Sequence, residues 1–268
     1  MIIEYDSWKE EHRNILEKFN EKFILLLFSG GKDSSVALDL LEKASREFDF
    51  QIHAHTVAFP THRYNNHEKQ RIDNFWNKRG ININWHYLDV DDSFIENNAN
   101  PCLPCQKVRR KIMKSKLGQY VEDLNQLVII VNYSLWDLVS YGMEYLLGDR
   151  FNKNKKENNE RSKRFLSIAQ RFYPIITMND GYTIFRPLIK YNGSQILNRV
   201  QAKGIPILSI PCRYRGYRPK RLLENYYERM GLHFDYNEVF DFAREALEIP
   251  DIESYLSIEK EKFFLEIF

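Results

Sequence analysis

Three groups of residues in this chain could carry chemistry. The first is the hexapeptide 29–34, which reads Ser-Gly-Gly-Lys-Asp-Ser and directly follows an apolar run. The second is the full set of cysteines, Cys102, Cys105 and Cys212. The third is the stretch 213–221, which carries five basic residues and two tyrosines. These residue types indicate an anion-binding loop, a thiolate-ligated metal centre and a surface for phosphate groups.

The hexapeptide has the composition of a loop that holds phosphate groups. Its two adjacent glycines let the backbone come close to a phosphate and adopt a positive φ. The N–H groups that follow, together with a helix N-terminus, form a nest for an anion. The lysine can neutralise phosphate charge, the aspartate can hold Mg²⁺, and both serines can donate hydrogen bonds. We expect phosphate contacts from Ser29, Gly30, Gly31, Lys32, Asp33 and Ser34.

The cysteines have the spacing and number of a metal centre rather than of disulfides. Cys102 and Cys105 stand three positions apart, so two thiolates can reach one centre, and Cys212 offers a third. An odd number of cysteines without an export signal makes stabilising disulfides improbable. Thiolate-only ligation suits zinc or an iron–sulfur cluster. Because four thiolates would close such a site, three leave one position open.

Basic residues follow two of the cysteines in the chain. In 213–221 guanidinium groups can hold phosphates while the tyrosines stack on bases. Two further arginines come shortly after the second cysteine, at the start of an expected helix. The residues that we expect to contact a substrate are Arg109, Arg110, Arg213, Arg215 and Arg218.

Each group also has a plainer interpretation. The hexapeptide could be an ordinary turn between a strand and a helix, although the spacing of P-loop NTPases is absent and excludes that class. The cysteines could be a structural zinc pair plus one buried thiol. The basic stretch could be a solvated turn.

The elements that must position these residues alternate between strand and helix. We expect strands at 23–28, 52–59, 83–88, 127–131 and 184–189, and helices near 36–44, 66–78, 108–124, 194–202, 222–230 and 239–247. This alternation predicts an α/β fold with a doubly wound parallel sheet. Ligands bind such sheets beyond the carboxyl ends of the strands, which is where the hexapeptide falls.

Composition and charge fit one large domain with an appendage. We expect a main domain at 1–212 and a helical extension at 213–268, with a polar loop at 152–164. The chain has 268 residues, 43% of them hydrophobic, which is enough for a full core. The net charge of +2 means that any nucleic-acid surface must be local. No apolar run reaches membrane-spanning length and the first residues do not form a signal peptide, so we expect no membrane association and a cytoplasmic location.

The motifs resemble a known superfamily. SGGKDSS after a buried strand resembles the PP-loop of the N-type ATP pyrophosphatases, the adenine nucleotide alpha-hydrolases, which adenylate a substrate and release pyrophosphate. CLPCQKVRR at 102–110, FRPL at 185–188 and PILSIPC at 206–212 resemble segments of the TtcA/TtuA-type tRNA 2-thiolation enzymes, TtcA in particular. The likeness covers roughly residues 20 to 230.

The resemblance implies a set of cofactors and roles. Cys102, Cys105 and Cys212 would ligate a [4Fe-4S] cluster whose free iron carries sulfur, and Lys32 and Asp33 would bind ATP and Mg²⁺. Ala58, at the end of the second expected strand, would contact the nucleotide. Two features depart from the pattern: the zinc fingers of the TtuA branch are missing, and in place of a GHxxDD motif only Asp137 offers a carboxylate for Mg²⁺.

The reaction implied is ATP-dependent replacement of a carbonyl oxygen by sulfur on a nucleobase of tRNA. A cysteine desulfurase or free sulfide would supply the sulfur, and a homodimer is left open. One alternative is the same chemistry on a small heterocycle, which the loss of the His-Asp motif favours. Another is a non-catalytic, nucleotide-binding redox sensor, which the intact Lys32–Asp33 pair counts against.

Overall fold

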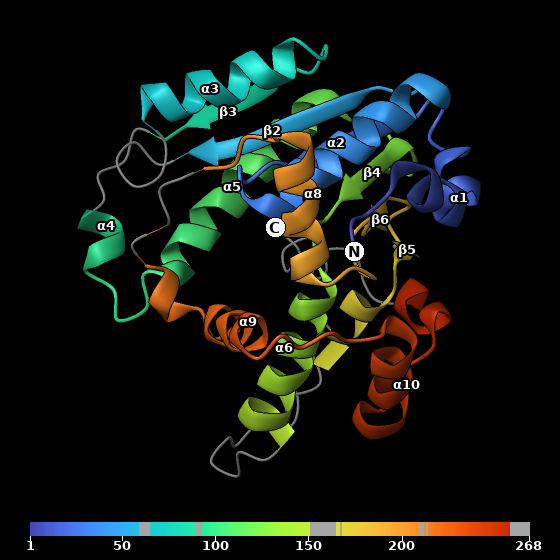
Figure 1. The fold of residues 1–268 in the computed structure, drawn as a ribbon, viewed down its shortest axis with the longest axis vertical. Helices are drawn as coiled ribbons and strands as arrows, with labels where there is room; N and C mark the ends of the chain where they lie inside the picture. The colour runs from blue at the N-terminus through green and yellow to red at the C-terminus, as the bar shows by residue number, and fades with distance from the viewer. Residues whose placement is uncertain are drawn as a thin grey trace.

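A central six-stranded sheet organises the computed structural model, in the strand order β3-β2-β1-β4-β6-β5 (Figure 1). The model describes residues 1–58, 65–88, 93–150, 165–166, 168–208, 212 and 214–257. All neighbouring strands are parallel except β5, which pairs antiparallel with β6. The strands are β1 (Phe23–Leu27), β2 (Ile52–Ala58), β3 (Ile83–Tyr87), β4 (Leu127–Ile130), β5 (Ile175–Thr177) and β6 (Thr183–Phe185). The expected α/β fold with a doubly wound parallel sheet is confirmed.

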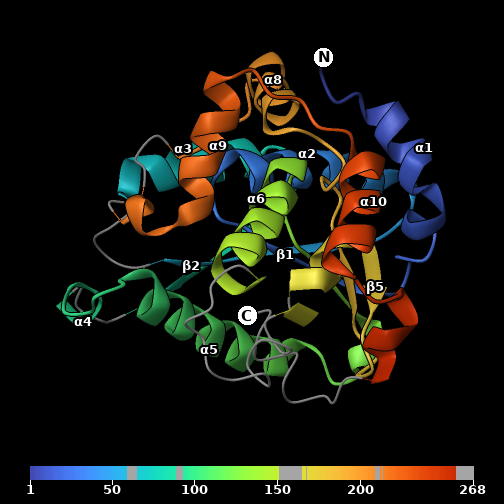
Figure 2. The same ribbon diagram turned by 90° about the horizontal axis from the view of Figure 1, so that it is seen from below.

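Helices cover both faces of this sheet, as Figures 1 and 2 show. The α-helices are α1 (Tyr5–Leu16), α2 (Lys32–Glu47), α3 (Asn66–Asn77), α4 (Ser93–Glu96), α5 (Cys102–Tyr120), α6 (Leu135–Tyr145), α8 (Gly193–Lys203), α9 (Pro219–Arg229) and α10 (Tyr236–Leu247). Shorter helical turns are η1 (Leu124–Gln126), η2 (Leu146–Arg150), η3 (Gln170–Phe172), η4 (Arg215–Tyr217) and η5 (Ile252–Ser257). None of the described helices combines the length and apolar composition that a membrane crossing requires.

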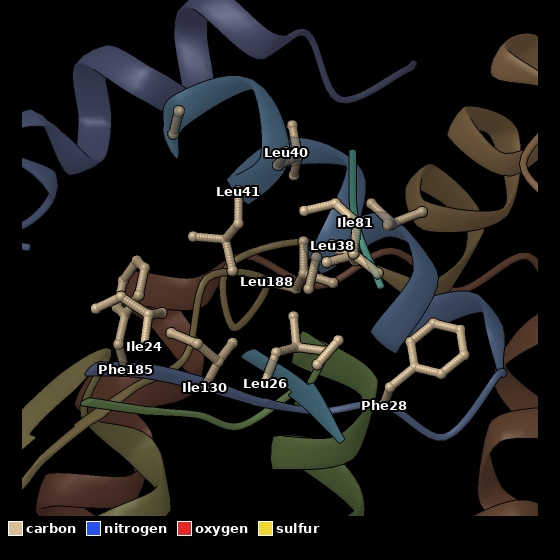
Figure 3. Packing of buried hydrophobic residues seen from close by; sticks show 14 of the residues in the cluster. Ile24, Leu26, Phe28, Leu38, Leu40, Leu41, Ile81, Ile130, Phe185 and Leu188 are labelled. Carbon is tan, nitrogen blue, oxygen red and sulfur yellow. The ribbon is translucent and has the colours of Figure 1, made fainter. Parts of the chain in front are cut away.

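The apolar strands bury side chains on both faces, because successive side chains of a strand point to opposite sides. Ile24 and Leu26 of β1 pack under α1, α2, α3 and α8, whereas Leu25 joins a second core under α5, α6 and α10. Figure 3 shows the first of these cores, with Leu38 and Leu41 of α2 beside the strand residues. The continuous apolar run of β1 therefore reflects burial on both sides of the sheet.

Several expected elements differ in the structure. The strand expected at 184–189 ends at Phe185, where Arg186 turns to bond Pro174 and Pro187 has no N–H to continue a ladder. Helix α1 was not expected, because its buried stripe includes the polar His12. Strand β5 was not expected either, because three residues are too few to show the alternation of apolar and polar side chains that marks a strand. The polar loop expected at 152–164 lies outside the described residues.

Candidate active site

The hexapeptide forms the turn between β1 and α2 and is shaped by its own serines. The Ser29 N–H donates to Ser34 Oγ at 3.1 Å, and the two hydroxyl oxygens are 3.0 Å apart. Gly30 has φ 69°, in the left-handed region that favours glycine. Gly31 is the N-cap of α2, so the first amides of this helix lie directly beyond the loop. The local structure is thus that of a strand–loop–helix anion nest.

Lys32 and Asp33 lie at the start of α2 and pair with each other. Lys32 Nζ is 2.5 Å from Asp33 Oδ1, and the side chains are 22% and 17% exposed. Both therefore remain accessible from solvent while their charges are balanced. A phosphate group that approached Lys32, or a divalent cation that approached Asp33, would compete with this pair.

A pocket of about 180 Å³ adjoins the loop. It lies where the carboxyl-terminal parts of β1 and β2 meet α5. Its lining consists of Leu27, Phe28, Ser29, His55, Thr56, Val57, Arg109, Arg110 and Met113. Two of the arginines expected to bind substrate therefore lie beside the phosphate loop. Ala58 is the last residue of β2, paired with Tyr87, and only its backbone is described.

The three cysteines have free thiols and occupy one neighbourhood. Cys102 and Cys105 lie buried in the first turn of α5, and Cys212 is partly buried. The Cys102 thiol contacts the Tyr214 carbonyl oxygen at 3.7 Å. Burial raises the pKa of the Cys105 thiol, and both other cysteines act on it in the same direction. The guanidinium groups of Arg109 and Arg218 act on the Cys105 pKa in the opposite direction.

The three thiols of this neighbourhood are donors of the kind that an iron–sulfur cluster takes. Within the described part of the chain, no group of three or more His, Cys, Asp or Glu side chains is arranged to hold one metal ion. In a cubane each thiolate ligates a different iron, so the three sulfurs need not converge on one point. The charged groups that act on Cys105 are guanidiniums, which would balance the negative charge of three thiolates.

The third cysteine is tied to the phosphate loop through the backbone. The Leu208 N–H, four positions before Cys212, donates to the Gly30 carbonyl oxygen at 2.8 Å. Of the basic residues that follow Cys212, Arg213 lies outside the described residues, and only the backbone of Arg215 is described, in η4. Arg218 is the N-cap residue of α9, and its Nε is buried without a hydrogen-bond partner.

Asp137 has partners other than a metal ion. It stands at the third position of α6, where Oδ2 accepts from the Ser134 N–H at 2.9 Å and from the Ser134 hydroxyl at 3.0 Å. Oδ1 accepts from Lys220 Nζ of α9. Burial would raise the pKa of Asp137, but the Lys220 ammonium outweighs burial and holds that pKa well below its usual range. Asp137 is 2% exposed, so a cation would have to displace Lys220.

Sequence reasoning did not anticipate the contacts that Lys220 and Arg171 make in the structure. Lys220 belongs to the basic stretch, but its contact with Asp137 spans 83 positions of the chain and has no local signal. Arg171 lies in η3, with its guanidinium 4.2 Å from the centre of the Tyr141 ring. The one available signal was the Asp137 carboxylate in the first turn of α6, because a buried carboxylate needs a partner.

Comparison with known proteins gives a structural likeness only. No family model and no curated protein matches the chain. A solved structure of the U34-tRNA thiolase NcsA from Methanococcus maripaludis with its [4Fe-4S] cluster matches with a TM-score of 0.65 and 16% identity, over 92% of this chain and 81% of that chain. NMN synthetase from Francisella tularensis matches with a TM-score of 0.41 and 15% identity, over 97% of this chain and 96% of that chain. NAD synthetase from Campylobacter jejuni subsp. jejuni matches with a TM-score of 0.42 and 13% identity, over 99% and 92%. At these identities the first likeness establishes the fold alone: the chain has the fold of the NcsA tRNA thiolase.

Proposed function

We propose that this protein is an ATP-dependent sulfurtransferase that replaces a carbonyl oxygen of a nucleobase with sulfur, using a [4Fe-4S] cluster held by Cys102, Cys105 and Cys212. The observation that carries the proposal is the convergence of a phosphate-type loop and three thiols. Leu208, just before the third cysteine, bonds the loop at Gly30. The Arg109 guanidinium opposes the rise that burial causes in the pKa of the Cys105 thiol. Arg109 also lines the pocket beside Ser29.

The nucleotide step rests on the loop between β1 and α2. Loop amides and Lys32 bind the phosphates of ATP. Because Lys32 then pairs with phosphate instead of with Asp33, the Asp33 carboxylate is free to hold Mg²⁺. The carbonyl oxygen of the acceptor attacks the α-phosphorus, and pyrophosphate leaves. Sulfide then attacks the activated carbon, and AMP leaves with the former carbonyl oxygen. When bound, the cluster would supply an iron atom without a protein ligand, at which sulfide can be held.

The proposed acceptor is tRNA. The basic stretch that begins after Cys212 supports it, since arginines hold phosphates along a backbone and Tyr217 is 50% exposed for stacking. A small heterocycle is the second candidate. It is favoured by the Asp137–Lys220 pair, which stands where the resembling tRNA enzymes carry their His-Asp motif.

The acceptor is tested by mass spectrometry of nucleosides and small metabolites from cells with and without the gene. We expect a thiolated tRNA nucleoside that disappears with the gene and returns with the wild-type gene, but not with a Cys212→Ala copy. A thiolated metabolite with unchanged tRNA would transfer the assignment to the small heterocycle. If neither changes, the sulfurtransferase proposal fails.

The nucleotide chemistry is tested with purified protein and its acceptor. We expect AMP and pyrophosphate, and ADP with inorganic phosphate would contradict the proposal. Lys32→Ala should weaken ATP binding about tenfold or more, because a hydrogen bond to a charged group contributes roughly 1.5–3 kcal/mol. Lys43→Ala, on the same helix and near the Tyr5 ring, is the matched control and should bind ATP like the wild type. ATP binding without pyrophosphate release would identify a sensor.

A further inference from the structure

Two tyrosines and three cations form a cluster that the proposed reaction leaves unused. We call it the Tyr141 cluster: Tyr133, Tyr141, Arg171, Arg186 and Lys220. The two tyrosine rings are 5.3 Å apart and meet edge to face. The guanidinium of Arg171 and the ammonium of Lys220 lie 4.2 Å and 5.6 Å from the Tyr141 ring centre. The aromatic faces thus hold two of the cations in place.

One cation of the cluster, Arg186, has no carboxylate partner among the described residues. Lys220 pairs with Asp137, and Glu144 and Asp137 raise the pKa of Arg171, whereas the groups that act on the Arg186 pKa are tyrosines and Arg171. Arg186 is 2% exposed, donates to the Tyr173 carbonyl at 2.7 Å, and keeps its Nε buried without a partner. Burial lowers the pKa of Arg186 to about 10. A buried charge without an opposite charge is unfavourable, so the unpaired Arg186 guanidinium favours an anion bound near it.

The three cations of the cluster also act on the pKa of Tyr133. Burial would raise the pKa of this phenol, yet the three surrounding cations outweigh burial and lower that pKa. Arg171, Lys220 and both tyrosines each keep part of their surface exposed. The polar atoms of the cluster are guanidinium, ammonium and phenol groups, all of which can donate hydrogen bonds to phosphate oxygens.

The cluster adjoins the phosphate loop. Tyr133 follows β4, the neighbour of β1, and the preceding Asn132 donates to the Leu27 carbonyl at 3.0 Å. Lys32 of the loop lowers the pKa of Asp137, so the two sites are within electrostatic range of each other. Helices α6 and α9, which bring Tyr141 and Lys220, lie side by side in both views (Figures 1 and 2).

We propose that the Tyr141 cluster is a second anion site, which binds a phosphate group beside the nucleotide loop. Arg171 and Lys220 contact the phosphate, and Asp137 positions Lys220. This inference rests on the proposed function, because the phosphate comes either from the pyrophosphate end of ATP or from the acceptor. In both cases the site would hold a group next to the α-phosphate during transfer and contribute positive charge there.

The test is calorimetric binding of inorganic phosphate and pyrophosphate to the wild type, Arg171→Gln and Arg229→Gln. Arg229 lies at the exposed end of α9 and serves as the matched control. We expect Arg171→Gln to weaken phosphate binding at least tenfold and Arg229→Gln to leave it unchanged. The loss should persist in a Lys32→Ala background, which separates this site from the loop. Equal affinity of Arg171→Gln and wild type would overturn the inference.

Saturation with the α,β-methylene analogue of ATP separates the two sources of phosphate. If the analogue blocks the Arg171-dependent binding of phosphate, the site takes the pyrophosphate end of ATP. If phosphate still binds in an Arg171-dependent way, the site takes the phosphate of the acceptor.

A conservative variant distinguishes the loss of a phosphate contact from misfolding. Arg171→Lys keeps the charge but lacks the planar fork, so it should bind phosphate several-fold more weakly than wild type but more tightly than Arg171→Gln. Wild-type affinity in Arg171→Lys and Arg171→Gln alike would contradict the inference. Intact ATP binding in these variants leaves the proposed function standing, whereas wild-type protein that fails to bind ATP at all contradicts the proposed function.

Discussion

His12, on α1, and His55, on β2, are both 3% exposed. His12 packs edge-on against Phe185 and Trp8, and its Nε2 has no hydrogen-bond partner. Burial lowers the pKa of His12 to about 4. Burial, together with the neighbouring His86 and His53, lowers the pKa of His55 to about 4. Both imidazoles are therefore neutral in the folded protein at neutral pH.

These depressed pKa values predict acid-sensitive stability. In the unfolded chain these two histidines bind protons near pH 6.5, whereas in the folded chain they bind protons only near pH 4. Their contribution to stability is therefore fully present above pH 6.5 and is lost as the pH falls towards 4. Between pH 7.5 and 5, His12→Phe should lose about 2 kcal/mol less unfolding free energy than wild type. Urea titrations at both pH values measure this. The exposed His233→Phe is the control, and an identical pH dependence in His12→Phe and wild type would contradict the account.

At the residue scale, type and spacing were enough for the phosphate loop and the cysteines to be singled out. The partners of Asp137 were not predictable. A carboxylate after a strand suggested a metal ligand, but Lys220 reaches it from α9, 83 positions away. Such a contact depends on how α6 and α9 pack, which no local pattern encodes.

At the scale of elements, α6 and α8 meet through a glycine. A Cβ at Gly193, the first residue of α8, would lie 2.4 Å from Trp136 Cε3. The preceding Asn192 accepts from Trp136 Nε1 at 3.0 Å and donates to the Phe234 carbonyl at 2.9 Å. One junction therefore joins α6, α8 and the segment before α10.

Gly193→Ala should disturb this junction. Because the Trp136 ring is 5% exposed and held by Asn192, it has little room to move, and we expect a loss of about 1–3 kcal/mol in unfolding free energy. Gly148→Ala, where an added Cβ would meet nothing within 4 Å, is the control. Chemical denaturation of the two variants compares them. Equal stability of Gly193→Ala and wild type would show that the junction is looser than described.

Long periodic elements were predictable from sequence and short ones were not. The apolar run of β1 and the helical spacing in α2 identify both elements, since burial dictates their patterns. The antiparallel β5 and the early end of β6 depend on the Arg186 N–H bond to Pro174, a tertiary contact. The division into 1–212 and 213–268 stays a prediction, although Lys220 of the second part pairs with Asp137 of the first.

At the scale of the whole molecule, charge is balanced apart from local clusters. The net charge is +2, so general attraction to nucleic acid is weak and binding must come from the basic stretch. If tRNA is the acceptor, several phosphates contact this stretch. The affinity of the protein for tRNA should then fall steeply as the salt concentration rises. A plot of the logarithm of affinity against the logarithm of salt concentration should have a slope of several units, because each neutralised phosphate releases counterions.

The salt dependence of bulk tRNA binding tests this in wild type and in an Arg215→Ala, Arg218→Ala double variant. We expect weaker binding and a smaller slope in the double variant. Arg244→Ala, which breaks the exposed ion pair between Arg244 of α10 and Asp251, should leave both the affinity and the slope unchanged. Equally feeble binding by all three proteins would exclude tRNA and favour the small heterocycle.

The central claim is that Cys102, Cys105 and Cys212 together hold one [4Fe-4S] cluster, and metal analysis of protein purified without oxygen tests it most directly. We predict about four irons and four sulfides per chain, a brown colour, and loss of both elements in each single Cys→Ala variant, with Arg229→Gln as the control. Stoichiometric zinc without iron, or a full complement of iron in Cys212→Ala, would contradict the account.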